Sequence, residues 1–250
     1  MKMTIRSIAV RNLGRIKYAR GLEIQKALQR AQLQMLNQPT GLNGDGKNVM
    51  DGHNSPYDAM DTLLICQHDP VYTIGVRQDG FDEEVQRLKK LNLNCEYYKT
   101  SRGGLITFHG PGQLVCYPII NLAHFTKSLR WYIHQLEKCL IATCNRFNVT
   151  AKTTEHTGVW VHDEKIAAIG IHSSRWITLH GIALNCNVDL SWFDHIVPCG
   201  IHGKGVTSLT AICDREVTVD EAIEPFVESF CDEFDCRVVN RTIDYNASIL

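Results

Sequence analysis

Residues 102 to 117 read Arg102-Gly-Gly-Leu-Ile-Thr-Phe-His-Gly-Pro-Gly-Gln-Leu-Val-Cys-Tyr117, a stretch that holds four glycines, a proline, an arginine and a histidine. Glycine lets the backbone adopt positive φ angles and lets a ligand approach the main chain closely. Thr107, His109 and Gln113 add polar side chains at fixed offsets. The stretch therefore indicates a segment that grips a ligand.

A second unusual stretch lies downstream, Ile196-Val-Pro-Cys-Gly-Ile-His-Gly-Lys-Gly-Val206, in which Cys199 stands between Pro198 and Gly200. These neighbours favour a fixed turn that leaves the thiol uncovered, whereas most of the other cysteines have apolar neighbours. An accessible thiol becomes a nucleophile when it is deprotonated. A ligand-binding segment together with a nucleophile favours group transfer, and a buried turn cysteine is the alternative for Cys199.

Size and charge narrow the function classes. A chain of 250 residues can bury a hydrophobic core without disulfides. The 26 basic and 27 acidic residues nearly cancel, so no overall field attracts the protein to nucleic acid or to an anionic membrane. No apolar run reaches the roughly 18 residues of a membrane-spanning helix. We therefore expect neither a nucleic-acid partner nor a membrane partner.

The ten cysteines include no Cys-x-x-Cys pair and have no regular spacing, which argues against a zinc site and against a disulfide framework. Most of them have apolar neighbours and are expected in the core, in a reducing compartment. The sequence also lacks a P-loop and a dinucleotide-binding fingerprint. We expect no metal and no cofactor.

The first 22 residues contain six basic side chains, and the first acidic residue is Glu23. This bias is typical of a mitochondrial targeting segment. The alternative is that Ile5 to Leu13 is the first strand and Tyr18 to Leu36 the first helix, because apolar residues recur there at helical spacing. Both interpretations of residues 1–22 stay open at this point.

Residues 37–57 are rich in Gly, Asn, Asp and Pro, so they are expected to form a mobile surface insertion. Strands are predicted at residues 62–66, 71–74, 94–99, 158–161, 165–172 and 175–184, and helices at residues 83–91, 128–147 and 219–234. Ser128 is a predicted N-cap, and Asp163-Glu164 a predicted hairpin turn. The pattern predicts a single α/β (α+β) domain over residues 1–250 with a mixed, mainly antiparallel sheet.

A cysteine nucleophile needs a base or a cation nearby. The candidates for this group are Lys165, Lys204, His195, His202 and His109. Lys165 begins the run Lys-Ile-Ala-Ala-Ile-Gly170, where a partly desolvated amine would act as a base. From the residues alone, however, a solvated lysine in the hairpin is the favoured interpretation of Lys165.

The glycine-rich stretch resembles the signature of the octanoyltransferases, the lipoyl(octanoyl) transferase family, and in particular its animal mitochondrial members. The resemblance continues through Thr157-Gly-Val-Trp160, Lys165-Ile-Ala-Ala-Ile-Gly170, His180-Gly-Ile-Ala-Leu-Asn185, Phe193-Asp-His-Ile-Val-Pro-Cys-Gly200 and Gly205-Val-Thr-Ser-Leu209. It covers nearly the whole chain, and the insertion at residues 37–57 is its main departure. The fold that it implies is an α/β domain of the biotin/lipoate protein ligase type.

The resemblance implies a mitochondrial octanoyl-acyl-carrier-protein:protein N-octanoyltransferase that starts protein lipoylation. Cys199 would accept the octanoyl group as a thioester, and Lys165 would activate the thiol and handle protons. The implied donor is octanoyl-acyl carrier protein, and the implied acceptors are the lipoyl domains of 2-oxo acid dehydrogenase E2 subunits and the glycine cleavage H protein. The implied acyl pocket consists of Arg102, Gly103, Gly104, Leu105, Ile106, Thr107, Phe108, His109, Ala168, Ile169, Gly170, Gly181, Ile182 and Ala183.

Two other functions are alternatives. An ATP-dependent lipoate or biotin protein ligase would share the fold but would activate a free acid as an acyl-adenylate, without a cysteine carrier. A non-catalytic module would bind acyl carrier protein or a lipoyl domain and would form no acyl-enzyme. Cys199 and Lys165 at the matching positions favour the transferase.

Overall fold

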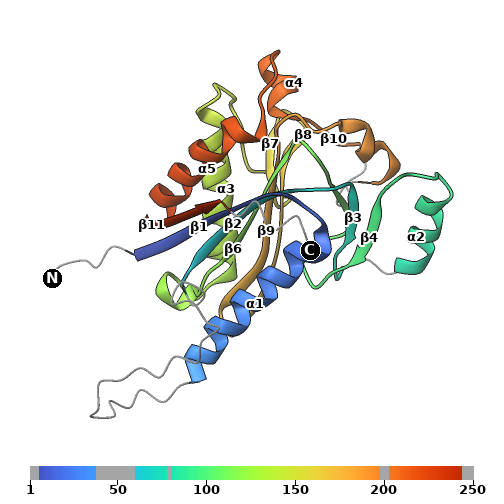
Figure 1. Cartoon of the computed structure of the whole chain (residues 1–250). Helices are drawn as coiled ribbons and strands as arrows, with labels where there is room; N and C mark the ends of the chain where they lie inside the picture. The colour runs from blue at the N-terminus through green and yellow to red at the C-terminus, as the bar shows by residue number, and fades with distance from the viewer. Residues whose placement is uncertain (1–5, 38–59, 78–79, 198–202, 244–250) are drawn as a thin grey trace, which may run out of the picture.

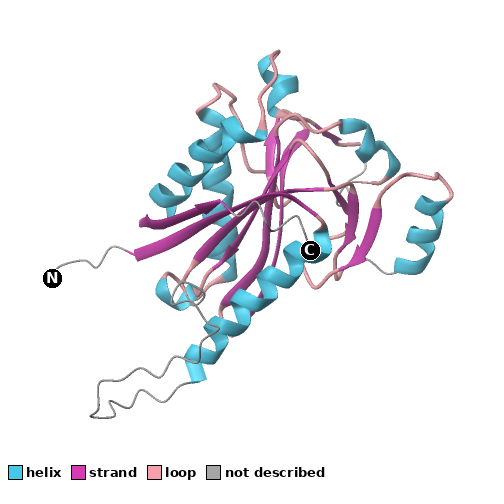
Figure 2. Cartoon of the chain, in the orientation of Figure 1, coloured by secondary structure: helices cyan, strands magenta, loops and turns pink. Residues whose placement is uncertain are grey.

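The computed structural model describes residues 6–37, 60–77, 80–197 and 203–243. They form a layered α/β structure in which a large sheet lies between helices and a smaller sheet stands beside it (Figure 1, Figure 2). The predicted α/β fold is therefore confirmed. Among the helices of the described ranges, none is long and apolar enough to cross a membrane.

The large sheet is built from β1 (Arg6–Ile16), β2 (Thr62–His68), β6 (Gln113–Ile119), β7 (Val159–Val161), β8 (Glu164–Ser174), β9 (Ile177–Asn185), β10 (Gly205–Val206) and β11 (Cys236–Ile243). Its order is β10-β8-β9-β6-β2-β1-β11, and β7 pairs with the first residues of β8, from Glu164 to Ala167. β1 is parallel to β2 and β11, and β10 is parallel to β8. The other neighbours are antiparallel, so the prediction of a mixed, mainly antiparallel sheet is confirmed.

The β7–β8 hairpin corrects one detail of the sequence interpretation. Its turn consists of His162 and Asp163, with His162 in the left-handed region at a φ of 51°. Glu164 already belongs to β8, so Asp163-Glu164 is not the turn. The predicted first strand is confirmed by β1, whereas the insertion predicted at residues 37–57 lies, apart from Asn37, outside the described residues.

One face of the large sheet is covered by α3 (Leu129–Asn145) and α5 (Val219–Phe234). Ser128 caps α3 as predicted, because its hydroxyl accepts a hydrogen bond from the Trp131 N–H at 3.2 Å. The cap satisfies one of the backbone donors that the first helical turn leaves unpaired. Leu136, Phe226 and Phe230 are fully buried in the main hydrophobic core between these helices and the sheet.

The other face carries α1 (Tyr18–Asn37), whose Leu28 packs with Leu64 and Ala183 in a second core cluster. The helix predicted at residues 18–36 is therefore confirmed. Its sheet-facing side also carries glutamines at i, i+4 and i+7 spacing, which places them on one helix face. Their contacts with the sheet backbone are Gln25 Oε1 with the His180 N–H at 2.9 Å, Gln29 Nε2 with the Ile177 carbonyl at 3.3 Å, and Gln32 Nε2 with the Ile119 carbonyl at 3.0 Å.

The smaller sheet has the order β4-β3-β5, from β3 (Val71–Ile74), β4 (Glu96–Lys99) and β5 (Thr107–His109). It packs with α2 (Phe81–Lys89) and with a 3₁₀ helix at Leu190–His195 around a third apolar cluster. A further 3₁₀ turn lies at Leu122–His124, and a short α4 at Leu209–Cys213. The glycine-rich stretch leaves the small sheet through β5 and enters the large sheet through β6, so it spans the junction of the two sheets.

Candidate active site

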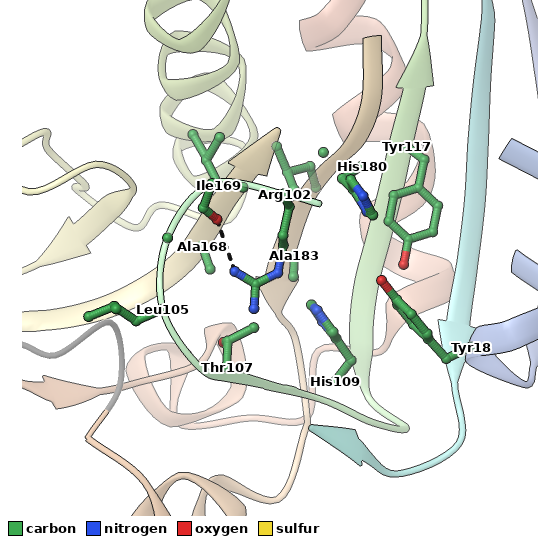
Figure 3. Close-up of a pocket in the computed structure, with 15 residues that line it drawn as sticks. Tyr18, Arg102, Leu105, Thr107, His109, Tyr117, Ala168, Ile169, His180 and Ala183 are labelled. Atoms are coloured by element: carbon green, nitrogen blue, oxygen red, sulfur yellow. Dashed lines mark hydrogen bonds between the residues drawn. The ribbon is translucent and has the colours of Figure 1, made fainter. Parts of the chain in front are cut away.

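A cavity with about 480 Å³ of empty space, part of it open to solvent, lies at this junction (Figure 3). The lining residues are Tyr18, Arg102, Gly103, Gly104, Leu105, Thr107, His109, Tyr117, Ala168, Ile169, Gly170, His180, Gly181, Ile182 and Ala183. The structure therefore brings together every predicted pocket residue except Ile106 and Phe108.

Ile106 and Phe108 are buried on the other side of β5, in the small-sheet cluster. Phe108 stacks on Trp192 with ring centroids 4.8 Å apart. Because side chains alternate along a strand, Thr107 and His109 turn toward the cavity when Phe108 turns away. Ile106 and Phe108 thus lie behind the cavity wall.

The floor of the cavity is made of small residues on β8 and β9. Ala168 is the cross-strand partner of Ala183, and Gly170 is the partner of Gly181. A Cβ on Gly181 would lie 2.1 Å from the Cys116 carbonyl oxygen, and a Cβ on Gly170 would lie 3.0 Å from Arg102 Cδ. Glycine at these two positions lets β6 lie close to β9 and lets Arg102 lie close over β8.

Arg102 forms one wall of the cavity and is only 7% exposed. Its Nη2 donates to the carbonyl oxygen of Thr73 at 2.6 Å and to the Thr73 hydroxyl at 2.9 Å, and its Nη1 donates to the Gly103 carbonyl at 3.0 Å. Charge-assisted hydrogen bonds of this kind fix an arginine side chain firmly. Arg102 thereby anchors the glycine-rich loop on β3.

His109 faces the cavity as a neutral imidazole. Burial, followed by the effect of His68, lowers the pKa of His109 to about 3. Its Nδ1 lies 2.7 Å from Gln113 Oε1, an oxygen that can only accept, so Nδ1 carries the proton and Nε2 keeps a lone pair. Gln113 is held in turn by Asn185, because Gln113 Nε2 donates to Asn185 Oδ1 at 2.9 Å. Gln113, whose polar group the sequence singled out, thus orients His109.

Three lining residues were not predicted: Tyr18, Tyr117 and His180. The Tyr117 hydroxyl lies 2.7 Å from His68 Nε2, and His68 Nδ1 lies 3.0 Å from the Ile16 carbonyl. The carbonyl can only accept, so His68 is protonated on Nδ1 and receives the Tyr117 hydroxyl hydrogen on Nε2. Burial lowers the pKa of His68 to about 4 and raises the pKa of Tyr18 to about 12. This end of the cavity is therefore polar but uncharged.

His180 stands on β9 at the same end of the cavity, beside Tyr117 (Figure 3). Burial, together with the charge of Arg102, lowers the pKa of His180 to about 3. Its Nε2 lies 3.3 Å from the Ser101 hydroxyl. The family resemblance included Tyr117, at the end of the glycine-rich stretch, and His180, within the motif His180 to Asn185, but it assigned neither of them to the pocket.

Lys165 is buried, with 5% exposure, and its Nζ lies 4.8 Å from the centre of the Trp160 ring. The interpretation of Lys165 as a solvated hairpin lysine is therefore wrong. A bulge explains its direction: Val159 pairs with Ala167 and Trp160 pairs with Lys165, so Ile166 is an extra residue on β8. Ile166 and Ala167 both pack into the core under α3 and α5, which leaves Lys165 on the face of the sheet that carries Ala168. Bulges re-aim side chains in this way next to functional sites.

The other candidate partners of a cysteine nucleophile lie in different surroundings. Lys204 is exposed and forms an ion pair with Asp163. His195 ends the second 3₁₀ helix, and His109 lines the cavity. Cys199 and His202 lie outside the described residues. Cys66, Cys116, Cys139, Cys144 and Cys186 are buried, and burial raises the pKa of each thiol.

Comparison with known proteins places the chain in a family. The family model described as lipoyl protein ligase A/B catalytic domain matches residues 49–231. A Danio rerio protein named mitochondrial octanoyl-acyl-carrier-protein:protein N-octanoyltransferase is 48% identical over 250 residues, which are 100% of this chain and 100% of that protein. The chain belongs to the octanoyltransferase family.

Further octanoyltransferases show the breadth of the match. A Homo sapiens protein of the same name is 40% identical over 244 residues, covering 94% of this chain and 98% of the human protein. An octanoyltransferase of Caldanaerobacter subterraneus is 42% identical over 231 residues, which are 91% of this chain and 90% of the bacterial protein. The family assignment made from the sequence motifs is therefore confirmed.

Solved structures show the same fold at low sequence identity. A lipoate protein ligase of T. acidophilum with bound lipoic acid has a TM-score of 0.67 and 14% identity, and the match covers 96% of this chain and 91% of that chain. The P. falciparum protein LipL1 in complex with lipoate has a TM-score of 0.66 and 16% identity, and the match covers 96% of this chain and 66% of LipL1. This octanoyltransferase thus has a lipoate protein ligase fold.

Proposed function

We propose that this octanoyltransferase transfers an octanoyl group from octanoyl-acyl carrier protein to the lysine amine of a lipoyl domain in two steps, through a thioester on Cys199. Its full-length relatives carry the name octanoyl-acyl-carrier-protein:protein N-octanoyltransferase. In the first step the Cys199 thiolate attacks the thioester carbonyl of the donor, and the carrier-protein thiol leaves. In the second step the acceptor amine attacks the acyl-enzyme, and the Cys199 thiolate leaves.

The burial of Lys165 on the cavity face carries this proposal. The amine lies on the same face of β8 as Ala168, which lines the cavity. In the proposed mechanism Lys165 takes the thiol proton in the first step and returns it to the departing carrier-protein thiol. In the second step Lys165 takes the proton that the acceptor amine loses and passes it to the departing Cys199 thiolate, which restores the starting enzyme. Each proton thus has a stated donor and acceptor.

We assign the acyl chain to the cavity between the glycine-rich loop and the floor of small residues. Each buried methylene contributes about 0.8 kcal/mol to binding, so an eight-carbon chain gains enough to be held there. In this assignment Ala168, Gly170, Gly181 and Ala183 form the floor under the chain, and the loop from Arg102 to His109 covers it. Ile106 and Phe108 support the loop from behind.

The finer partners belong to the same proposal. The acceptors are the lipoyl domains of 2-oxo acid dehydrogenase E2 subunits and the glycine cleavage H protein, and the enzyme acts in mitochondria. The names of the animal relatives, which include the word mitochondrial, and the basic residues at the start of the chain support this location.

Intact mass spectrometry tests the mechanism. The protein is mixed with octanoyl-acyl carrier protein as wild type, Cys199→Ser and Lys165→Ala. We expect a hydroxylamine-labile octanoyl adduct on wild type that maps to Cys199, forms much more slowly in Lys165→Ala and has no hydroxylamine-labile counterpart in Cys199→Ser. Modification of a lipoyl domain only with ATP and free octanoate would instead indicate a ligase, and binding without any transfer would indicate a non-catalytic module.

A further inference from the structure

We propose that Gln25 on α1 is a positioning residue of the acyl cavity, which acts by holding His180 in the backbone conformation that its place in the cavity wall requires. The proposal rests on the function proposed above, because it concerns the same cavity. Gln25 does not line the cavity itself.

The backbone of His180 is unusual. Its φ is 58°, in the left-handed region, although it lies within β9. For a residue with a Cβ this conformation costs roughly 1–2 kcal/mol. Such strained residues persist only where the surroundings hold them in place, and they cluster at functional sites.

The sheet itself does not hold His180 on the β6 side. The pairing of β6 with β9 ends at Cys116 and Ile182. Beyond that point the carbonyl oxygen of Pro118 receives the Thr178 hydroxyl hydrogen at 2.6 Å, so it serves Thr178 instead of the strand ladder. The N–H of His180 turns away from β6 and donates to Gln25 Oε1 at 2.9 Å, across 155 residues of sequence.

Gln25 lies fully buried between α1 and the sheet, where its Oε1 accepts the His180 N–H. Its exposure is 0%, and its Nε2 has no hydrogen-bond partner among the residues that the structure describes. An unsatisfied buried amide is costly, so packing or general polarity does not account for a glutamine here. A leucine or methionine would fill the same space without that cost, whereas only a polar side chain accepts the His180 N–H.

His180 connects the contact with Gln25 to the loop that begins at Ser101 and covers the cavity. Its Nε2 lies 3.3 Å from the Ser101 hydroxyl, directly before Arg102 in the chain. β8 also holds the loop that contains Ser101, Arg102 and Gly103, because the Gly103 N–H donates to the carbonyl oxygen of Ile171 on β8 at 2.9 Å. The loop of Arg102 and the floor at Gly181 are therefore linked through His180, and Figure 3 shows His180 and Arg102 on adjoining parts of the wall.

The test compares Gln25→Met with Gln29→Met. Both remove a glutamine that α1 directs at the β9 backbone, but Gln29 meets the Ile177 carbonyl at 3.3 Å, outside the cavity lining. The rate of acyl-enzyme formation is measured over a range of octanoyl-, hexanoyl- and decanoyl-acyl carrier protein concentrations. We expect Gln25→Met to lower kcat/KM for octanoyl about tenfold, mainly through KM, and to reduce the preference for octanoyl. Gln29→Met stays within about twofold of wild type.

A double-mutant cycle with His180→Gly separates positioning from general stability. Glycine adopts positive φ without strain. If Gln25 acts by holding the backbone conformation of residue 180, a glycine at this position no longer needs the contact with Gln25. We expect Gln25→Met to change neither the octanoyl preference nor kcat/KM in the His180→Gly background. Equal losses in both backgrounds, or a Gln25→Met enzyme with wild-type selectivity, would overturn the proposal. Absence of an acyl-enzyme in wild type would overturn the proposed function instead.

Discussion

Gly170 and Gly181 lie directly opposite each other on β8 and β9, and at each of them a methyl group would lie unusually close to a neighbouring group. The two obstacles differ. The Cβ of an alanine at 181 would meet the Cys116 carbonyl oxygen at 2.1 Å, which is backbone of the neighbouring strand, whereas at 170 the nearest atom is Arg102 Cδ at 3.0 Å.

Gly181→Ala is expected to destabilise the fold, because β6 and β9 would have to separate. Overpacking of this kind costs about 1–3 kcal/mol or more. Gly170→Ala is expected to be milder for stability but to slow acylation, because the Arg102 side chain moves. Urea unfolding and the acylation rate distinguish the two variants. Equal losses of stability would contradict the view that the contact at residue 181 is with rigid backbone and the contact at residue 170 is with a movable side chain.

Lys165→Met is expected to slow acylation of Cys199 by about 10²- to 10⁴-fold, the usual size of an acid–base contribution. Methionine keeps an unbranched apolar side chain and removes the amine that lies over the Trp160 ring. Rapid-quench measurement with octanoyl-acyl carrier protein gives the rate. Lys204→Met is the matched control, because Lys204 is exposed and paired with Asp163. A comparable loss of rate in Lys204→Met would show that positive charge in this part of the protein is what matters, and not the amine of Lys165.

Tyr117→Leu is expected to shift the acyl-chain preference toward decanoyl. Cys116 pairs with Ile182, so Tyr117 lies at the level of Gly181, farther along the sheet from Lys165 than Ala168 and Ala183 are. The smaller side chain lengthens the cavity at the end that His68 now holds rigid. Competition between octanoyl- and decanoyl-acyl carrier protein measures the shift. Tyr98→Leu, which removes a ring packed behind Tyr18, serves as the control.

Acid is expected to destabilise the protein below about pH 6.5, because three buried histidines are neutral in the folded state. The folded-state pKa is about 4 for His68 and about 3 for His109 and His180, below the ordinary 6.5. Between these values the unfolded chain binds protons that the folded protein does not, so stability falls as the pH decreases from 6.5 toward 4. The loss is about 1.4 kcal/mol per histidine for each pH unit.

Urea midpoints between pH 7.5 and 4.5 check this dependence. His68→Gln removes one of the titrating groups and is expected to flatten the slope. A stability that is constant over this range would show that the three imidazoles are not held neutral.

Much of the fold followed from local patterns. The helix at residues 18–36, the Ser128 cap and the strands at residues 62–66 and 71–74 rest on periodicity and capping, which neighbouring residues determine. β5 and β6 were not predicted, because glycines and Pro118 concealed two short strands within the ligand-binding stretch. β11, at the sheet edge, reads Cys-Arg-Val-Val-Asn-Arg-Thr-Ile without a regular alternation of polar and apolar residues, so it also gave no clear signal.

The site depended more on tertiary structure. The burial of Lys165 follows from the extra residue Ile166 on β8, and no local pattern indicated that bulge. Tyr18 and Tyr117 line the cavity because α1 crosses β6 and β9, which only the assembled fold determines. Ile106 and Phe108 fell outside the cavity because a strand turns alternate residues to opposite sides.

The contact between Gln25 and His180 joins groups 155 residues apart in the chain. Contacts of such long range form late, because the loop between them must close first. The cavity therefore cannot exist in a nascent chain that ends before β9, whose residues line it, and such a chain has no place to shelter an acyl group. Acyl-donor binding would select the completely folded protein and would raise its unfolding temperature as the donor concentration rises.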